Sequence, residues 1–230
     1  MRSILLVAAA SLQLAAHSQL TNGCFTIGGP EFELARAVVQ TTDGGYAFAG
    51  LTYSYSNGFT DENAYVVKTD ANGTVEWNMG YGNAAPGTTD LMYDLIQTTD
   101  GGYALAGVSD YNSMGLVKLD AAGAVEWAKE YDTGDDDAVD DLYAVVQTPD
   151  GGYVLAGSGG AVGSIQTMAV VIKTDASGAI EWSKGYENGF AFDEAYDVVV
   201  APAGGYAMCS WHQGGTVPGM RIWRLDDLGA

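Results

Sequence analysis

Four copies of one short motif decide the fold of this chain. Residues 40–46 read Gln-Thr-Thr-Asp-Gly-Gly-Tyr, and the pattern returns at residues 97–103, at residues 147–153 and, in degenerate form, at residues 200–206. The tyrosines that end the four copies are 57, 50 and 53 residues apart. A recurring period of this length is the signature of a repeat architecture, in which each copy is one small structural unit.

A second motif follows the first in three of the copies. It reads Lys-x-Asp-x-x-Gly-x-x-x-Trp and occupies residues 68–77, 118–127 and 173–182. Both motifs are typical of tight β-hairpins, because glycine adopts a positive φ without a Cβ clash and an Asp side chain bonds backbone amides two residues further on. Each repeat is therefore predicted to contain four strands joined by two uniform hairpins.

The strands between these turns are apolar on both faces. In the third repeat they are predicted near residues 143–148, 153–157, 169–174 and 179–184. Strands rich in Val, Ile, Leu and Ala on both sides belong to sheets that are covered on both faces. Copies stacked around an axis provide that cover. The sequence thus predicts an all-β fold, a four-bladed β-propeller of four-stranded antiparallel blades.

The last copy lacks its fourth strand, and the N-terminal region offers a replacement. Residues 25–28 align without gaps on residues 182–185, with Phe25 in the tryptophan position. We expect the N-terminal strand, residues 22–28, to complete the last blade and close the ring. The four predicted blades are residues 29–81, 82–131, 132–186, and 187–230 together with 22–28. The alternative is a fragment of a longer propeller array.

Residues 1–18 have the pattern of a signal peptide. Arg2 is followed by an apolar run, residues 4–10, that is too short to span a bilayer, and residues 16–18 place small side chains before a break at Gln19. Residues 19–230 are then predicted to form one propeller domain that is secreted, either extracellular or on the cell surface. No later stretch is apolar for long enough to predict membrane insertion.

The net charge and the small number of histidines argue against several classes of partner and of catalytic site. Nine Lys and Arg against 29 Asp and Glu give a formal net charge of −20, which disfavours nucleic acid and anionic lipid as partners. With His17 in the signal peptide, only His212 remains, so two-histidine zinc sites are excluded and a Ser-His-Asp triad would need His212. Cys24 and Cys209 align two strands apart, about 9.6 Å, and are expected to be free, buried thiols.

The two motifs together resemble the repeats of secreted bacterial cell-surface β-propellers, over nearly all of residues 22–230. That resemblance implies an extracellular propeller and carries over no catalytic residue. The Asp-x-x-Gly-x-x-x-Trp half is also distantly similar to the tryptophan docking motif of quinoprotein propellers and to the Asp-box of sialidases. In those families the motif is structural, which implies that Trp77, Trp127 and Trp182 pack between blades. Sialidases also need an arginine cluster, and only three arginines follow residue 18.

Aromatic residues in the loops that differ between copies are the candidates for ligand binding. Such loops on a rigid scaffold usually carry function, and aromatic rings beside carboxylates and amides suit a sugar or a peptide. The candidate residues are Tyr53, Tyr55, Phe59, Tyr111, Trp211 and His212. The alternative is that these rings only cover the rims of the blades.

An acidic run in the connection between the second and third blades is a weak candidate for calcium. Calcium takes six to eight oxygen ligands from a flexible loop, although this run lacks the ligand order of an EF-hand. The candidate ligands are Asp132, Asp135, Asp136, Asp137, Asp140 and Asp141. The alternative is a solvated charged loop, and acids in the other connections (Glu31, Asp90, Asp193 and Glu194) fit a shared acidic rim.

These observations favour a secreted, non-catalytic binding or structural module that recognises a glycan or a protein. Calcium is the one candidate cofactor, and no other is expected. The alternative is a propeller glycoside hydrolase or lyase that uses acidic loop residues. Hydrolysis would need one carboxyl of raised pKa inside a pocket, and the sequence identifies none. The oligomeric state is not predicted.

Overall fold

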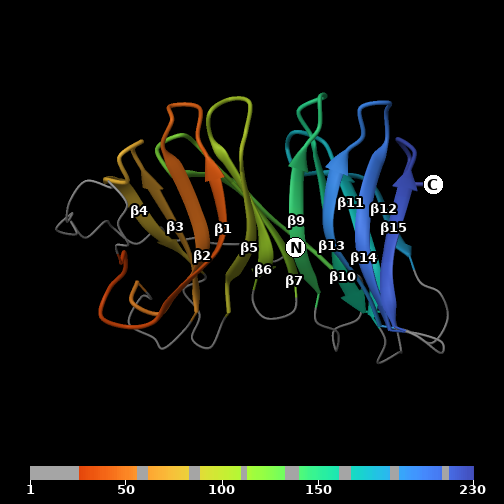
Figure 1. Cartoon of the computed structure of the whole chain (residues 1–230), viewed down its shortest axis with the longest axis horizontal. Helices are drawn as coiled ribbons and strands as arrows, with labels where there is room; N and C mark the ends of the chain where they lie inside the picture. Colours follow the sequence, from red (N-terminus) through yellow and green to blue (C-terminus); the bar gives the residue numbers. More distant parts are fainter. Residues whose placement is uncertain are drawn as a thin grey trace. The chain divides into compact units, whose positions relative to one another are not determined.

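The computed structural model describes residues 26–55, 62–82, 89–109, 113–132, 140–160, 167–186, 192–213 and 218–230. All regular structure within these ranges is β, fifteen strands in four sheets (Figure 1), which confirms the predicted all-β class. Within the same ranges, no helix could cross a membrane. The predicted signal peptide lies outside the described residues, as do Cys24, Phe59, Tyr111 and Asp135–Asp137.

Each sheet is formed by strands that are consecutive in the chain. The first sheet contains β1 (Glu33–Gln40), β2 (Tyr46–Thr52), β3 (Asn63–Thr69) and β4 (Val75–Tyr81). The second contains β5 (Leu91–Gln97), β6 (Tyr103–Ser109), β7 (Ser113–Leu119) and β8 (Val125–Tyr131). The third contains β9 (Asp141–Gln147), β10 (Tyr153–Gly160), β11 (Thr167–Thr174) and β12 (Ile180–Tyr186). The fourth contains β13 (Phe192–Val200), β14 (Tyr206–Gln213) and β15 (Gly219–Leu225).

The two repeated motifs form the hairpins that the sequence predicts. In the first sheet, the Gly44 N–H donates to Thr41 O at 2.9 Å, and Gly44 has a φ of 87°. In the second hairpin, Asp70 Oδ1 accepts hydrogen bonds from two backbone amides of its own turn, those of Asn72 and Thr74. The predicted strands of the third repeat are confirmed, with ends that differ by at most three residues.

The chain divides into two compact units, which are described separately. The first comprises residues 1–105, 109–111 and 117–128, and the second comprises residues 106–108, 112–116 and 129–230. Strands of the second sheet therefore contribute to both units.

The two units use the same packing arrangement. In the first unit, β5 packs against β1, β2 and β3, and Leu95 and Tyr103 join an apolar cluster with Val66. In the second unit, β13 packs against β9, β10 and β11, and Val198 joins a cluster with Val171. The first strand of one sheet thus covers an apolar face of the preceding sheet, the kind of stacking that a two-faced apolar sheet requires.

In each unit, a motif tryptophan packs at the contact between adjacent sheets. The Trp77 ring lies edge-on to the Tyr103 ring with centroids 5.7 Å apart, and the centroids of the Trp182 and Tyr206 rings lie 6.0 Å apart. The Trp182 Nε1–H also donates to Asp227 O at 3.1 Å. For Trp77 and Trp182, the structure therefore confirms packing against the next sheet along the chain.

The first and fourth sheets differ from the others. In the described residues the fourth sheet has three strands. Residues 26–29 lie outside any strand, and residues 22–25 are not described. Closure of the ring by residues 22–28 therefore stays a prediction. On β1, Val38 is 61% exposed, whereas Leu95 and Val198 at the same repeat position are 2% and 4% exposed. Cys209 is a half-buried free thiol.

Candidate functional site

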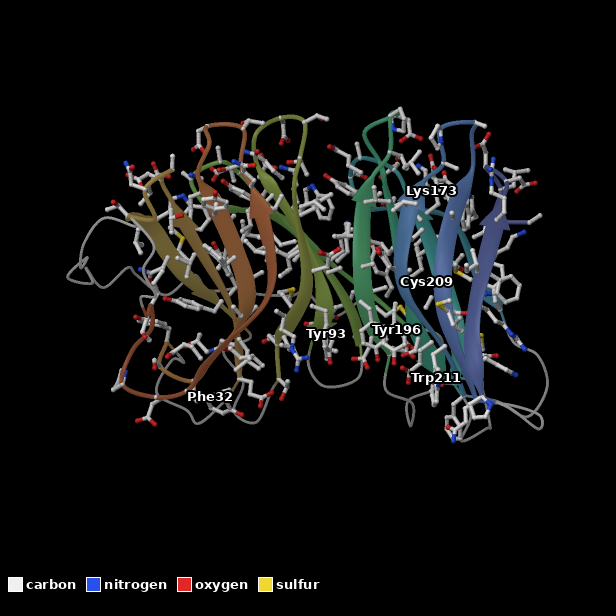
Figure 2. All side chains as sticks on the ribbon, viewed as in Figure 1. Phe32, Tyr93, Lys173, Tyr196, Cys209 and Trp211 are labelled. Carbon is white, nitrogen blue, oxygen red and sulfur yellow. The ribbon has the colours of Figure 1, made fainter. Side chains whose placement is uncertain are left out.

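Buried lysines occupy the hairpin end of the first three sheets. Lys173 Nζ donates to Asp150 at 2.9 Å, to Glu181 at 2.8 Å and to the Thr174 carbonyl at 2.9 Å. Lys68 and Lys118 make the equivalent ion pairs. The charges at this end, where Figure 2 shows Lys173, therefore pair with one another and stabilise the hairpins.

The opposite end of each sheet carries a carboxylate at the start of the first strand. These acids each stand 13 residues before the motif tyrosine, and they are Glu33, Asp90, Asp140 and Asp193. The first three each accept a hydrogen bond from a residue at the end of the second strand of the same sheet. Asp193 contacts a histidine at that position. The partners are Thr52 Oγ1, Ser109 Oγ, the Gly160 amide and His212 Nδ1. The sequence analysis placed Asp90, Asp140 and Asp193 among the acids of the blade connections, but it did not include Glu33 or identify the constant distance to the motif tyrosine.

A β-bulge follows these acids in the three sheets whose registers are defined. The pairing of the first strand with the second skips one residue in each, namely Arg36 in β1, Tyr143 in β9 and Tyr196 in β13. Tyr93 holds the same repeat position in β5. A bulge re-aims the extra side chain, and bulges are frequent at edge strands and beside functional sites. The sequence signal was present, because tyrosine recurs ten residues before the motif tyrosine in three repeats.

In the second unit, two bulge tyrosines meet two carboxylates. The Tyr143 and Tyr196 rings lie 5.2 Å apart at 31°. Each hydroxyl donates to the carboxylate two residues earlier, Tyr143 to Asp141 Oδ2 at 2.9 Å and Tyr196 to Glu194 Oε2. We call Asp141, Tyr143, Glu194 and Tyr196 the tyrosine–carboxylate cluster. Tyr196 is 47% exposed, so a ligand can reach the cluster; Figure 2 shows this residue toward the lower end of its strand.

The cluster is electrostatically negative. Burial raises the pKa of Asp141, the hydrogen bond from Tyr143 partly offsets that rise, and the charges of Glu194 and Asp140 add to it. The hydrogen bond to Glu194, with burial, raises the pKa of Tyr196 to about 12. Both shifts follow from carboxylates gathered in a partly desolvated place.

In the first unit the same repeat position holds a cation over a ring. The Arg36 guanidinium carbon lies 5.1 Å from the centroid of the Tyr93 ring. This distance is within the range of a cation–π interaction.

Asp193 and His212 form a buried pair beside the cluster. His212 Nδ1 lies 2.5 Å from Asp193 Oδ1, and both side chains are buried. The second oxygen, Asp193 Oδ2, has no hydrogen-bond partner within the described residues. A buried polar atom of this kind usually has a partner, so it marks a place where a further group would be stabilised.

No family model matches this chain. No curated protein matches it either. A solved structure of a protein of unknown function from Bacteroides caccae is similar at 16% sequence identity with a TM-score of 0.48, and the match covers 83% of this chain. This chain spans 60% of that structure's length. The similarity carries no functional argument.

The candidate aromatic residues of the first sheet pack on their neighbours. The Tyr53 ring lies edge-on to Phe32 with centroids 6.1 Å apart, and its hydroxyl donates to Glu62. The Tyr55 ring stacks on Tyr65 at 5.2 Å. Both candidates are half-buried, so they present part of each ring to solvent.

The remaining described candidates lie on β14. Trp211 is half-buried and pairs across the sheet with Glu194 of the cluster. His212 is buried against Asp193. The fold thus places Trp211 opposite Glu194 of the tyrosine–carboxylate cluster, whereas His212 lies on the other face of β14 with Asp193.

Half of the predicted calcium ligands are described. Asp132 is exposed, Asp140 Oδ1 accepts from the Gly160 amide at 3.0 Å, and Asp141 Oδ2 accepts from Tyr143. Among the described residues, no group of three or more His, Cys, Asp or Glu side chains is arranged to hold a metal ion.

The second unit also contains a shallow pocket of about 230 Å³. Its lining is largely apolar and includes Met114, Met168, Val170 and Ile172, with Lys184 among its polar members. The volume falls below the roughly 300–1,000 Å³ of ordinary small-molecule sites. The bulge edge is therefore the stronger candidate site.

Proposed function

We propose that this chain is a secreted, non-catalytic binding module with the architecture of a four-bladed β-propeller. The four repeated sheets and the stacking of one sheet on the next within each unit support the architecture. The signal-peptide pattern of residues 1–18 supports export. The ligand is an extracellular glycan or protein, and calcium remains a cofactor to be tested.

The uncovered faces of the first and last sheets support ring closure. Val38 on β1 is exposed, although its repeat counterparts are buried against the preceding sheet. Met220 and Ile222 on β15 are also exposed. In the proposed ring the last sheet covers the first, and residues 22–28 pair with β15, so that all these apolar side chains leave water.

The contrast between the two ends of the sheets carries the binding function. At the hairpin end, the buried lysines pair with carboxylates of their own sheet. At the opposite end, the tyrosines at two bulges donate hydrogen bonds to carboxylates, and Asp193 Oδ2 lacks a partner among the described residues. A binding site needs such groups on a rigid scaffold.

The test is a binding screen with residues 19–230 against glycan and extracellular-protein panels, with calcium and with a chelator. We expect a ligand whose binding is lost in Tyr196→Ala and retained in Thr42→Ala, an exposed change at the hairpin end. If no glycan or protein bound under either condition, or if Thr42→Ala removed binding as completely as Tyr196→Ala, the proposed site would be wrong.

One observation favours the enzymatic alternative. Asp141 has a raised pKa beside Glu194, the combination of a carboxylic acid and a carboxylate that glycoside hydrolysis uses. Glycan cleavage that is abolished by Asp141→Asn would establish this second function. If the module only binds, products are absent with the unsubstituted chain as well.

A further inference from the structure

We propose that the tyrosine–carboxylate cluster binds a guanidinium or ammonium group, carried by an Arg or Lys side chain of a protein partner. This inference rests on the proposed binding function and names the chemistry of its ligand.

The chain itself shows how this repeat position receives a cation. In the first unit the bulge residue is Arg36, and its guanidinium lies over the Tyr93 ring. In the second unit both equivalent residues are tyrosines, Tyr143 and Tyr196. The second unit therefore has an aromatic ring at both of these positions, and neither position provides a cation.

The hydrogen bonds of the cluster leave acceptors for a cation. Asp141 and Glu194 each accept from a tyrosine hydroxyl through one carboxylate oxygen. Within the described residues, the structure shows no donor to the other oxygen of either group. A guanidinium donates from a planar fork that fits such oxygens and can stack on an aromatic ring.

The local charge also requires a cation. Asp140, Asp141, Asp193 and Glu194 stand at the starts of two strands that pack in the same unit, and the charges of Glu194 and Asp140 help to raise the pKa of Asp141. Asp193, 2% exposed, keeps Oδ2 unpartnered within the described residues. A sugar hydroxyl could donate to the oxygens of Asp141 and Glu194, but it would add no positive charge beside these two carboxylates. A bound cation lowers that electrostatic cost directly.

The experiment compares two peptides that differ only in charge. Residues 19–230 are titrated by calorimetry with an Arg-containing peptide and with the same peptide in which citrulline, a neutral isostere, replaces Arg. We expect the Arg peptide to bind at least roughly tenfold more tightly, with an affinity that falls as salt rises.

Variants locate the site. Tyr196→Ala and Glu194→Gln should each weaken Arg-peptide binding by roughly tenfold, because one removes the ring and the other a charge. Tyr196→Phe keeps the ring and should bind within about threefold of the unsubstituted chain. Tyr46→Ala, which removes a tyrosine at the hairpin end, is the control and should leave the affinity for the Arg peptide unchanged. Thermal unfolding of every variant verifies that each one is folded.

Equal affinity for the Arg and citrulline peptides, or equal loss in Tyr46→Ala and Tyr196→Ala, would overturn this inference. A glycan that binds at the cluster without competition from the Arg peptide would also overturn it, while the proposed binding function would stand. If no glycan, protein or peptide bound at all, both proposals would fail.

Discussion

At the residue scale, the buried lysines show how a strongly acidic chain keeps positive charge inside its sheets. Lys118 is 4% exposed and lies 3.0 Å from Asp100 and 2.8 Å from Glu126. Burial works to lower the pKa of Lys118, but the hydrogen bonds from its ammonium to Glu126 and Asp100 outweigh burial and raise it. The paired carboxylates remain in contact with solvent, so the triad is anchored by the lysine.

Replacement of Lys173 by Met tests this anchoring role. Methionine keeps most of the apolar stem but removes three hydrogen bonds from a charged donor, and we expect the free energy of unfolding to fall by about 1.5–3 kcal/mol. Lys129→Met, at a half-buried lysine outside the motif, should change stability by about 0.5 kcal/mol or less. Urea unfolding measures both, and equal losses would contradict the anchoring role.

The motif aspartates predict sensitivity to acid. Hydrogen bonds from Thr148, Lys173 and the Gly152 amide, partly opposed by burial, lower the pKa of Asp150 from 3.8 to about 2. A carboxyl whose pKa is lower in the folded state stabilises the fold above the unfolded pKa, and that contribution is lost as the pH falls through the folded value. We therefore expect stability to decline between about pH 4 and pH 2.

Urea midpoints measured across this range check the prediction. Lys173→Met removes one of the groups that lower the Asp150 pKa, so the folded pKa moves closer to the unfolded one and the decline should be smaller in that variant. A decline with the same pH dependence in both proteins would show that the ion pair does not contribute.

At the element scale, a tight contact in each unit joins one hairpin glycine to the tryptophan of the preceding sheet. A Cβ added at Gly123 would lie 3.0 Å from the Trp77 ring, and Tyr81 donates a hydrogen bond to the Gly123 carbonyl at 2.7 Å. Gly229, Trp182 and Tyr186 repeat the arrangement in the second unit. The glycine of this hairpin therefore serves the turn and the packing of sheet on sheet.

A pair of glycine substitutions separates these two roles. Gly101 and Gly123 have φ values of 86° and 85°, but a Cβ at Gly101 would meet nothing within 4 Å. Gly101→Ala should cost about 1–2 kcal/mol from the backbone alone. Gly123→Ala should cost about 1–3 kcal/mol more, because the methyl group displaces the Trp77 ring. Chemical denaturation of both variants measures the difference, and equal costs would refute the packing role.

At the scale of the whole molecule, the repeats leave an apolar face at each end of the series. Within each unit, one sheet receives the first strand of the next sheet on its apolar face, whereas Val38, Met220 and Ile222 in the described structure are exposed. A solvent-exposed apolar face is a liability for aggregation, and ring closure would remove it.

The substitution Val38→Asp tests closure. If the last sheet covers the first, as proposed, the new carboxylate is desolvated and the free energy of unfolding falls by about 1–3 kcal/mol or more. Val198→Asp at the same repeat position, which is 4% exposed, provides the reference for a buried site. A change of about 0.5 kcal/mol or less in Val38→Asp, with a large loss in Val198→Asp, would show that the ring is open.

Local chemistry explains why so much of the fold could be predicted. The Asp-Gly-Gly and Asp-x-x-Gly turns depend on groups only a few residues apart, so Asp70 and Gly44 behave in the structure as their motifs predict. The strand positions follow from these turns. The bulges were missed because a bulge depends on pairing with a second strand, and the sequence of Tyr143 and its neighbours does not show which residue the pairing skips.

The sequence by itself determined the repeat, its turns, the all-β class and the pairing of each strand with the next, because these depend on short-range geometry and on apolar patterning. Only the tertiary structure decided which side chains meet between sheets. Tyr143 and Tyr196 are 53 residues apart in the chain, and they come into contact because β13 packs against β9. The same packing gathers their carboxylates into one partly desolvated place. Contacts of that kind depend on the distance between sheets, which no single repeat contains.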